Sequence, residues 1–307
     1  MKGVPGPILA VMLPAVLVVA FPAAAAFAAA TGTVTGAAAA IAGSEPGYTL
    51  TSAVDWAAGT VEVEITRALD PSVPSLLKAK GNAETDIESR LPDFLMRAAG
   101  PVTVDSTSTF DDLLGADPGL HSRVSAIAQL AKRTAVFLSG DFSSLVERFA
   151  VPLYGAQGIA RPLFPSRATP VHTLLGDVTT RKYTGLLIDA RGVLPEAGKN
   201  GGTAVLQPAV FPRIWDEQMN LVMDRAMCDP GSLAQWGMVA YARGLDEDVV
   251  PLRTGELPLR LAARAVFGDR GTDVVISIDG ARQLLALADN IALLRQGRVV
   301  IVYGPQP

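Results

Sequence analysis

The strongest constraint on the fold is a long stretch with helical hydrophobic spacing that directly follows a strand-like segment. Over residues 75–99, apolar side chains recur at three- and four-residue intervals, which predicts an amphipathic helix. Before this stretch, Val61, Val63 and Ile65 alternate with polar residues, and such alternation predicts a half-buried strand. The two periods together predict a helix packed on a sheet.

The rest of the first half completes the same layer. Pro118 follows Asp117 and opens a predicted helix that extends to about Lys132. Strands are then predicted over 134–138 and 145–154, separated by a turn. The order of strand, helices and strands predicts an antiparallel sheet with helices packed on one face.

The second half predicts another small α+β domain that is richer in strands. It begins with YTGLLIDARG, residues 183–192, whose two faces are both apolar, as expected of a central strand. The further predicted elements are a hairpin over 209–223, one strand over 259–267, a helix over 280–294 capped by Asp279 and a last strand over 298–303. The fold class is therefore α+β, with two small mixed domains.

The predicted organisation follows composition as well as periodicity. The first residues have the pattern of a targeting segment, and a proline-rich stretch lies near the middle of the chain. The predicted segments are a signal peptide (1–30), a flexible mature N-terminus (31–50), an N-terminal domain (51–155), a linker (156–182) and a C-terminal domain (183–305).

The N-terminal segment predicts export. Lys2 precedes the apolar run 8–21, and Ala26 and Ala28 supply small residues at the spacing that signal peptidase cleaves. An uncleaved membrane anchor is the alternative, since the stretch from Ile8 to Ala30 is nearly long enough to span a bilayer. Either way the body is expected in the periplasm or at the outer-membrane periphery. Cys228 lies far from this segment, so the chain is not expected to be a lipoprotein.

Composition argues against several classes of function. The net charge is −4 and no basic run occurs, so nucleic acid is not an expected partner. With two histidines and one cysteine, the chain predicts neither a metal site nor a bound cofactor. The serine-hydrolase motif G-x-S-x-G and the phosphate-binding P-loop are both missing from the sequence.

Carboxylates are the remaining candidates for chemistry. Asp189 ends the central strand, and Asp216 and Glu217 lie in the predicted hairpin turn, where convergence would give the carboxylate pair of a glycosidase. The structural interpretation is that Asp189 accepts backbone N–H groups of the next turn and pairs with Arg191 before the chain turns at Gly192. We favour the structural interpretation.

The motifs of the second half resemble a group of largely uncharacterised exported bacterial proteins found in spirochaetes and delta-type proteobacteria. The resemblance depends on the order of YTGLLIDARG, the segment PAVFPRIWDEQMNLV that contains Arg213, WGMVAYAR and a closing TDVVIS…VVIVY region, which together cover about the last 120 residues. The first half resembles, more loosely, small envelope lipoproteins and the flagellar assembly protein T family. The resemblance implies a structural role in the envelope or flagellum and supplies no active site.

The expected function is therefore that of a non-enzymatic envelope protein with a structural or assembly role. Its expected partners are other envelope proteins, including flagellar or outer-membrane components, with membrane contact only through an uncleaved N-terminal segment. Two alternatives stay open: an envelope hydrolase that uses Asp189, Asp216 and Glu217, and a ligand- or peptidoglycan-binding module that uses the loop 192–203.

Overall fold

The first domain is built on a five-stranded antiparallel sheet. A computed structural model describes residues 43–171, 173 and 178–305. The sheet has the order β1-β2-β3-β5-β4. Its strands are β1 (Gly43–Glu45), β2 (Tyr48–Asp55), β3 (Thr60–Ala68), β4 (Lys132–Leu138) and β5 (Ser144–Pro152). The sheet thus extends into the segment 31–50, which the sequence predicts to be flexible.

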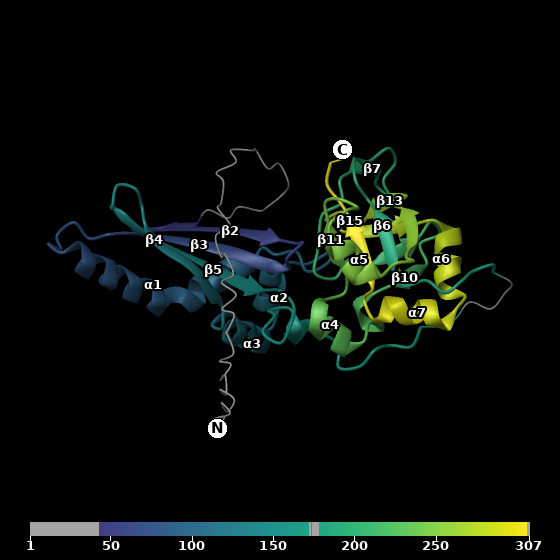
Figure 1. Ribbon diagram of the computed structural model, residues 1–307, viewed down its shortest axis with the longest axis horizontal. Coiled ribbons are helices and arrows are strands. Elements are labelled where there is room, and N and C mark those ends of the chain that lie inside the picture. Colours follow the sequence, from purple (N-terminus) through teal and green to yellow (C-terminus); the bar gives the residue numbers. More distant parts are fainter. Residues whose placement is uncertain (1–42, 172, 174–177, 306–307) are drawn as a thin grey trace, which may run out of the picture. The chain divides into compact units, whose positions relative to one another are not determined.

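Helices cover one face of this sheet, as predicted. Helix α1 (Leu76–Ala99) begins at Ser75, whose side chain accepts a hydrogen bond from the Lys78 amide, and it contacts β2, β3 and β5. Figure 1 shows α1 running along the sheet, and α2 (Phe110–Ala116) and α3 (Pro118–Ala128) follow it. The predicted extension of α3 to Lys132 is wrong, because that residue already begins edge strand β4.

The second domain contains two four-stranded sheets and a short hairpin. The parallel sheet has the order β11-β15-β6-β12, and the mixed sheet has the order β10-β9-β14-β13. The strands are β6 (Leu186–Asp189), β7 (Leu194–Pro195), β8 (Thr203–Ala204), β9 (Ile214–Asp216), β10 (Leu221–Met223), β11 (Ala240–Ala242), β12 (Leu259–Ala262), β13 (Ala265–Phe267), β14 (Asp273–Ile276) and β15 (Val299–Val302).

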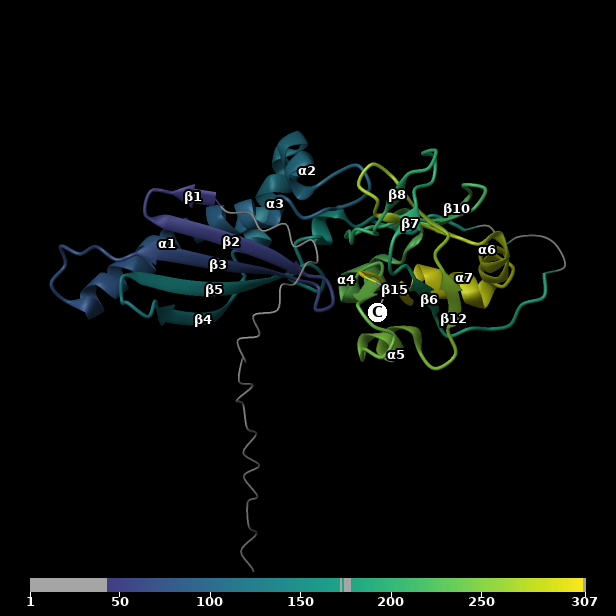
Figure 2. The same cartoon turned by 90° about the horizontal axis from the view of Figure 1, so that it is seen from above.

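The predicted central strand is confirmed. Strand β6 lies between β15 and β12, parallel to both, and the side chains of β15 are all buried. One face of this sheet contacts α5 (Val249–Thr254), and the other contributes Leu186 and Ile188 to the main core. Burial on both faces explains the continuous apolar runs of β6 and β15. Figure 2 shows the same elements from above.

Two other predictions for the second half are wrong in detail. Residues 259–267 form two strands in different sheets, since β12 pairs with β6 and β13 pairs with β14. The helix predicted over 280–294 is divided into α6 (Ile278–Leu285) and α7 (Ala288–Arg295). Ser277, not Asp279, caps α6, because its hydroxyl accepts from the Gly280 amide.

The remaining helical elements were not predicted. They are α4 (Pro230–Trp236) and the short 3₁₀ helices η1 (Arg161–Leu163) and η2 (Arg225–Met227). Residues from both domains belong to one buried core, and all described residues lie in a single compact unit of the chain. The α+β class with two domains is confirmed, and its ladders are mostly antiparallel, with a parallel sheet added in the second domain.

Candidate functional site

Asp189 is a structural acceptor at the end of β6. The Arg191 side chain donates to it from Nε at 2.9 Å and from Nη2 at 2.6 Å, and the Arg191 amide donates at 3.2 Å. These hydrogen bonds hold the pKa of Asp189 below its usual value. The chain then turns at Gly192, which has a φ of +83°. The predicted pairing of Asp189 with Arg191 is confirmed.

Asp216 and Glu217 also accept hydrogen bonds from backbone amides. The carboxylate of Asp216 accepts from the amides of Gln218 and Asn220 at 2.9 and 2.8 Å, and from Asn220 Nδ2 at 2.9 Å. Glu217 accepts from the amide of Ile278, at the start of α6. Both carboxylates therefore fix a turn or a helix start, which is a common use of acidic side chains.

The backbone amide of Arg213 donates to a buried carboxylate, that of Asp273, which was not predicted from the sequence. This hydrogen bond is 3.1 Å long, and the Nε of Arg213 donates to Asp224 at 3.1 Å. Asp273 is fully buried and also accepts from Trp215 Nε1. Burial raises the pKa of Asp273. These contacts tie β9 to β14.

The sequence candidates lie on different sheets of the second domain. Asp189 belongs to the parallel sheet, whereas Asp216 ends β9 of the mixed sheet and Glu217 follows it. No hydrogen bond or ion pair within the described residues joins Asp189 to either. In the part of the chain that the structure describes, no group of three metal-binding side chains occurs. Each of the three carboxylates instead has its partners in its own turn or at a helix start.

The histidines and the cysteine also stay apart. His121 is exposed on α3, and His172 lies outside the described residues. Cys228 is buried, and burial raises the pKa of its thiol to about 12. A thiol with that pKa is almost entirely protonated near neutral pH, so it is a poor nucleophile.

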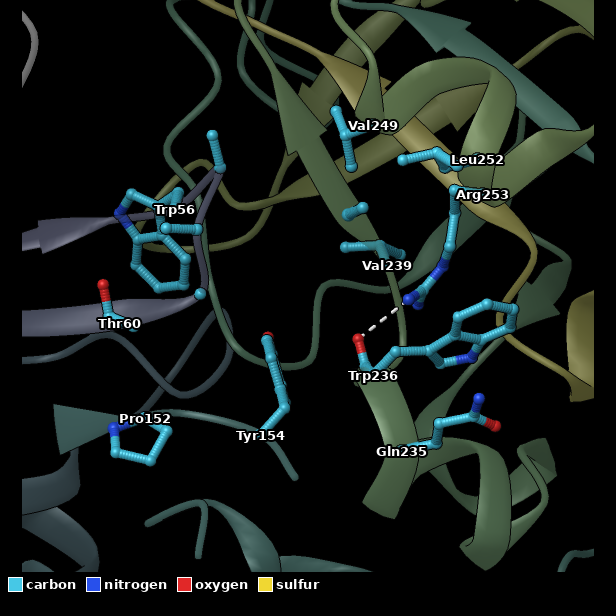
Figure 3. Close-up of a pocket in the computed structure, with 14 residues that line it drawn as sticks. Trp56, Thr60, Pro152, Tyr154, Gln235, Trp236, Val239, Val249, Leu252 and Arg253 are labelled. Atoms are coloured by element: carbon cyan, nitrogen blue, oxygen red, sulfur yellow. Dashed lines mark hydrogen bonds between the residues drawn. The ribbon is translucent and has the colours of Figure 1, made fainter. Parts of the chain in front are cut away.

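A concave surface that was not predicted from the sequence is a groove lined by aromatic side chains. We define the aromatic groove by Trp56, Tyr154, Trp236, Leu252 and Arg253, which line a cavity of about 520 Å³ together with smaller residues. Figure 3 shows these side chains around a common space. They come from the β2–β3 turn, the segment after β5, the end of α4 and α5.

Local structure fixes the aromatic walls. The ring of Trp56 packs edge-on against the ring of Tyr241, with 5.6 Å between the ring centroids. The hydroxyl of Tyr154 donates to the Val210 carbonyl at 3.3 Å. Its ring lies against Gly237, where an added Cβ would come within 2.5 Å of it, so only glycine fits there. The groove therefore has a preformed shape.

A buried cation lies in the wall of the groove. Arg253 is 4% exposed and donates to three carbonyls, those of Trp236, Gly237 and Gly297, at 2.9, 2.7 and 2.5 Å. Its guanidinium also stacks 4.4 Å from the Trp236 ring centroid. Within the described residues, no carboxylate forms an ion pair or hydrogen bond with it, and burial lowers its pKa to about 10.

Comparison with known proteins divides the chain as the fold does. Residues 48–156 match the family model of the N-terminal domain of Treponema pallidum Tp0624, and residues 185–305 match the model of its second domain. The chain fits the two-domain family of Tp0624. No curated protein matches it. The predicted resemblance to a spirochaete group is confirmed in this coarser form. The aromatic groove takes Trp56 and Tyr154 from the first matched segment, and Trp236 and Arg253 from the second.

Proposed function

We propose that the chain is an exported, non-enzymatic protein of the cell envelope with a structural or assembly role. The targeting pattern of residues 1–30, which lie outside the described part of the chain, supports export. Among the described residues, no helix is both long and apolar enough to cross a membrane. The periplasm or the outer-membrane periphery is the proposed location.

One observation carries the choice of a structural role over hydrolysis. Asp189, Asp216 and Glu217 each accept hydrogen bonds from groups that end a strand, close a turn or begin a helix. A glycosidase-type site would need two carboxyls that face a shared substrate space. The pairing of Asp189 with Arg191 also lowers the pKa of Asp189, which is opposite to the raised pKa that a general acid needs.

The alternative of ligand binding by the loop 192–203 has less support. Lys199 pairs with Glu196 within this loop, and the amide of Ala197 donates to the Val266 carbonyl of β13. The loop is thus held by its own charges and by the mixed sheet. The aromatic groove is lined by other segments, and its concave apolar lining supports a binding role more than this loop does.

Gene deletion tests the proposal. Loss of an assembly factor is expected to change motility or the protein composition of the envelope fractions, and complementation with the unchanged gene should restore both. Complementation with Glu217→Gln should also restore them, because that side chain is partly exposed and its hydrogen bond to Ile278 can be kept by an amide oxygen. Normal motility and envelope composition, with a soluble protein that has no partner, would refute the assembly role. Failure of a folded Glu217→Gln variant would favour the hydrolase.

A further inference from the structure

We infer that the aromatic groove binds a short peptide segment of a partner protein, in which an acidic side chain stands next to an apolar or aromatic one. The inference rests on the proposed assembly role and names the surface and the chemistry of the partner. Three features of the groove carry it: its size, its exposed apolar rim and its buried cation.

The size fits a few side chains rather than a folded domain. A cavity of about 520 Å³ lies within the range of sites that bury one small ligand. Its aromatic walls come from Trp56, Tyr154 and Trp236, residue types that are enriched at protein interfaces because they bury much area with little loss of side-chain entropy. An apolar anchor residue would fill this space.

The rim favours a peptide over a free small molecule. Leu252 of α5 lines the cavity but is 77% exposed, so the apolar surface continues out of the groove. A ligand confined to the cavity would leave most of this side chain in water. An extended chain with residues on both sides of its anchor would cover Leu252 as well.

The buried guanidinium of Arg253 favours a partner with a negative charge. A guanidinium has five N–H donors, and three of those of Arg253 reach carbonyl acceptors. Those carbonyls hold the side chain, and no carboxylate in the described part of the chain pairs with its positive charge. Figure 3 shows the guanidinium beside Trp236, among the side chains that surround the groove. A peptide carboxylate would pair with this charge in a partly desolvated site, where charge-assisted hydrogen bonds are strong.

Selection from a peptide library tests the inference. A displayed library of random peptides of about eight residues is selected on protein purified from cells that express the full-length chain. Enriched peptides are expected to share Asp or Glu next to an apolar or aromatic residue. Replacing that acid in a synthetic enriched peptide by its amide should weaken binding by about tenfold, since a charge-assisted pair is lost while the protein is unchanged.

Variants of the chain locate the binding surface. Leu252→Glu should weaken binding of the enriched peptide by at least about tenfold, because it removes apolar contact and adds a repelling charge. Leu77→Glu is the matched control, since Leu77 is 79% exposed at the start of α1, far from the groove in sequence, and its binding should stay within about twofold of the unchanged chain. Both side chains are exposed, so both variants are expected to fold.

Several results would overturn the inference. These are a library without enrichment, enriched peptides that lack an acid, or equal binding to Leu252→Glu and the unchanged chain. A dimer of the unchanged chain that Leu252→Glu dissociates would instead assign the groove to a second copy. The deletion experiment is scored separately: an envelope defect without peptide binding removes only the groove inference, and peptide binding without any envelope defect removes only the assembly role.

Discussion

Replacing Glu147 by leucine is expected to stabilise the first domain at neutral pH. Glu147 lies in β5 on the face that packs under α1, and it is fully buried. Neither carboxylate oxygen has a hydrogen-bond partner among the residues that the structure describes, and Arg133 Nη1 is 3.6 Å away, which is too far for a good hydrogen bond. Burial is the largest cause that raises the pKa of Glu147, with Glu84 and Glu88 adding to it and Arg133 opposing it.

The magnitude follows from the unpaired oxygens. A buried acceptor without a partner costs about 1–3 kcal/mol, and a leucine of similar volume removes this cost. Arg133 is about half exposed, so water can solvate its charge once the carboxylate is gone. Glu147→Leu should therefore raise the free energy of unfolding by about 1–3 kcal/mol near pH 8.

The sign of the pH dependence is specific to a raised pKa. Below the ordinary value of 4.5, Glu147 is protonated in the folded and the unfolded chain, so the cost of burying its charge is absent. As the pH rises through the folded pKa, the unfolded chain loses its proton more readily and the unchanged protein loses stability. The advantage of Glu147→Leu should then be smaller near pH 4, where only the cost of the neutral, unpaired carboxyl is left, and larger near pH 8, where the cost of the buried charge is added.

Urea unfolding followed by circular dichroism measures this difference. Glu147→Gln should gain less than Glu147→Leu, because the amide is neutral but still lacks partners. Glu62→Leu is the matched control on β3, where the side chain is exposed, and it should change the free energy by less than about 0.5 kcal/mol at both pH values. A Glu147→Leu variant that is less stable than the unchanged chain near pH 8, or equally stabilised at both pH values, would refute the reasoning.

Three further predictions test other contacts. Gly268→Ala should lower Tm by several degrees more than Gly201→Ala. Both glycines have positive φ, but only at Gly268 would an added Cβ come within 2.4 Å of the Cβ of Ser106. Equal decreases in Tm for the two variants would contradict a clash at Gly268. Cys228 should react with a thiol reagent at pH ~8 only after unfolding in urea, because burial raises its pKa to about 12, and rapid labelling of the folded chain would contradict this. Asp189→Asn should lower the free energy of unfolding by about 1 kcal/mol at neutral pH, because the pairing with Arg191 stabilises the partly exposed, charged carboxylate. Since this pairing lowers the pKa of Asp189, its stabilising effect is present above about pH 4 and is lost as the pH falls below it. Urea unfolding at both pH values measures the effect, and a stability difference between variant and unchanged chain that persists in acid would contradict it.

The elements that the sequence predicted well are those in which local spacing determines burial. Helix α1 and strand β3 have their periods written in consecutive residues, and their observed bounds are close to the predicted ones. The strand that holds Asp189 was also predicted as central, because both of its faces are apolar. Its end, with the Asp189–Arg191 pair, follows from the two-residue repeat of a strand.

The elements that were missed depend on contacts far along the chain. Helices α4 and α5 have too few turns to display a period, and they are stabilised by packing rather than by propensity. The residues 259–267 read as one strand because the change of sheet at Ala263 leaves no mark in the apolar pattern. Only Ala263, which is buried, and Arg264 separate β12 from β13, and neither is a glycine or proline that would signal a turn.

The aromatic groove shows why site prediction from the sequence failed while strand prediction succeeded. Its walls come from four segments that span about 200 residues, and each aromatic residue stands near a glycine that looks like an ordinary turn signal. Arg253 is the clearest case, because a single arginine in a short apolar helix gives no hint that three carbonyls hold it in place. Since that residue both positions α4 against α5 and supplies the charge of the groove, substituting it would confound folding with binding. The acid-to-amide change in the peptide avoids the difficulty, because it alters the charge pair and leaves every contact inside the chain as it is.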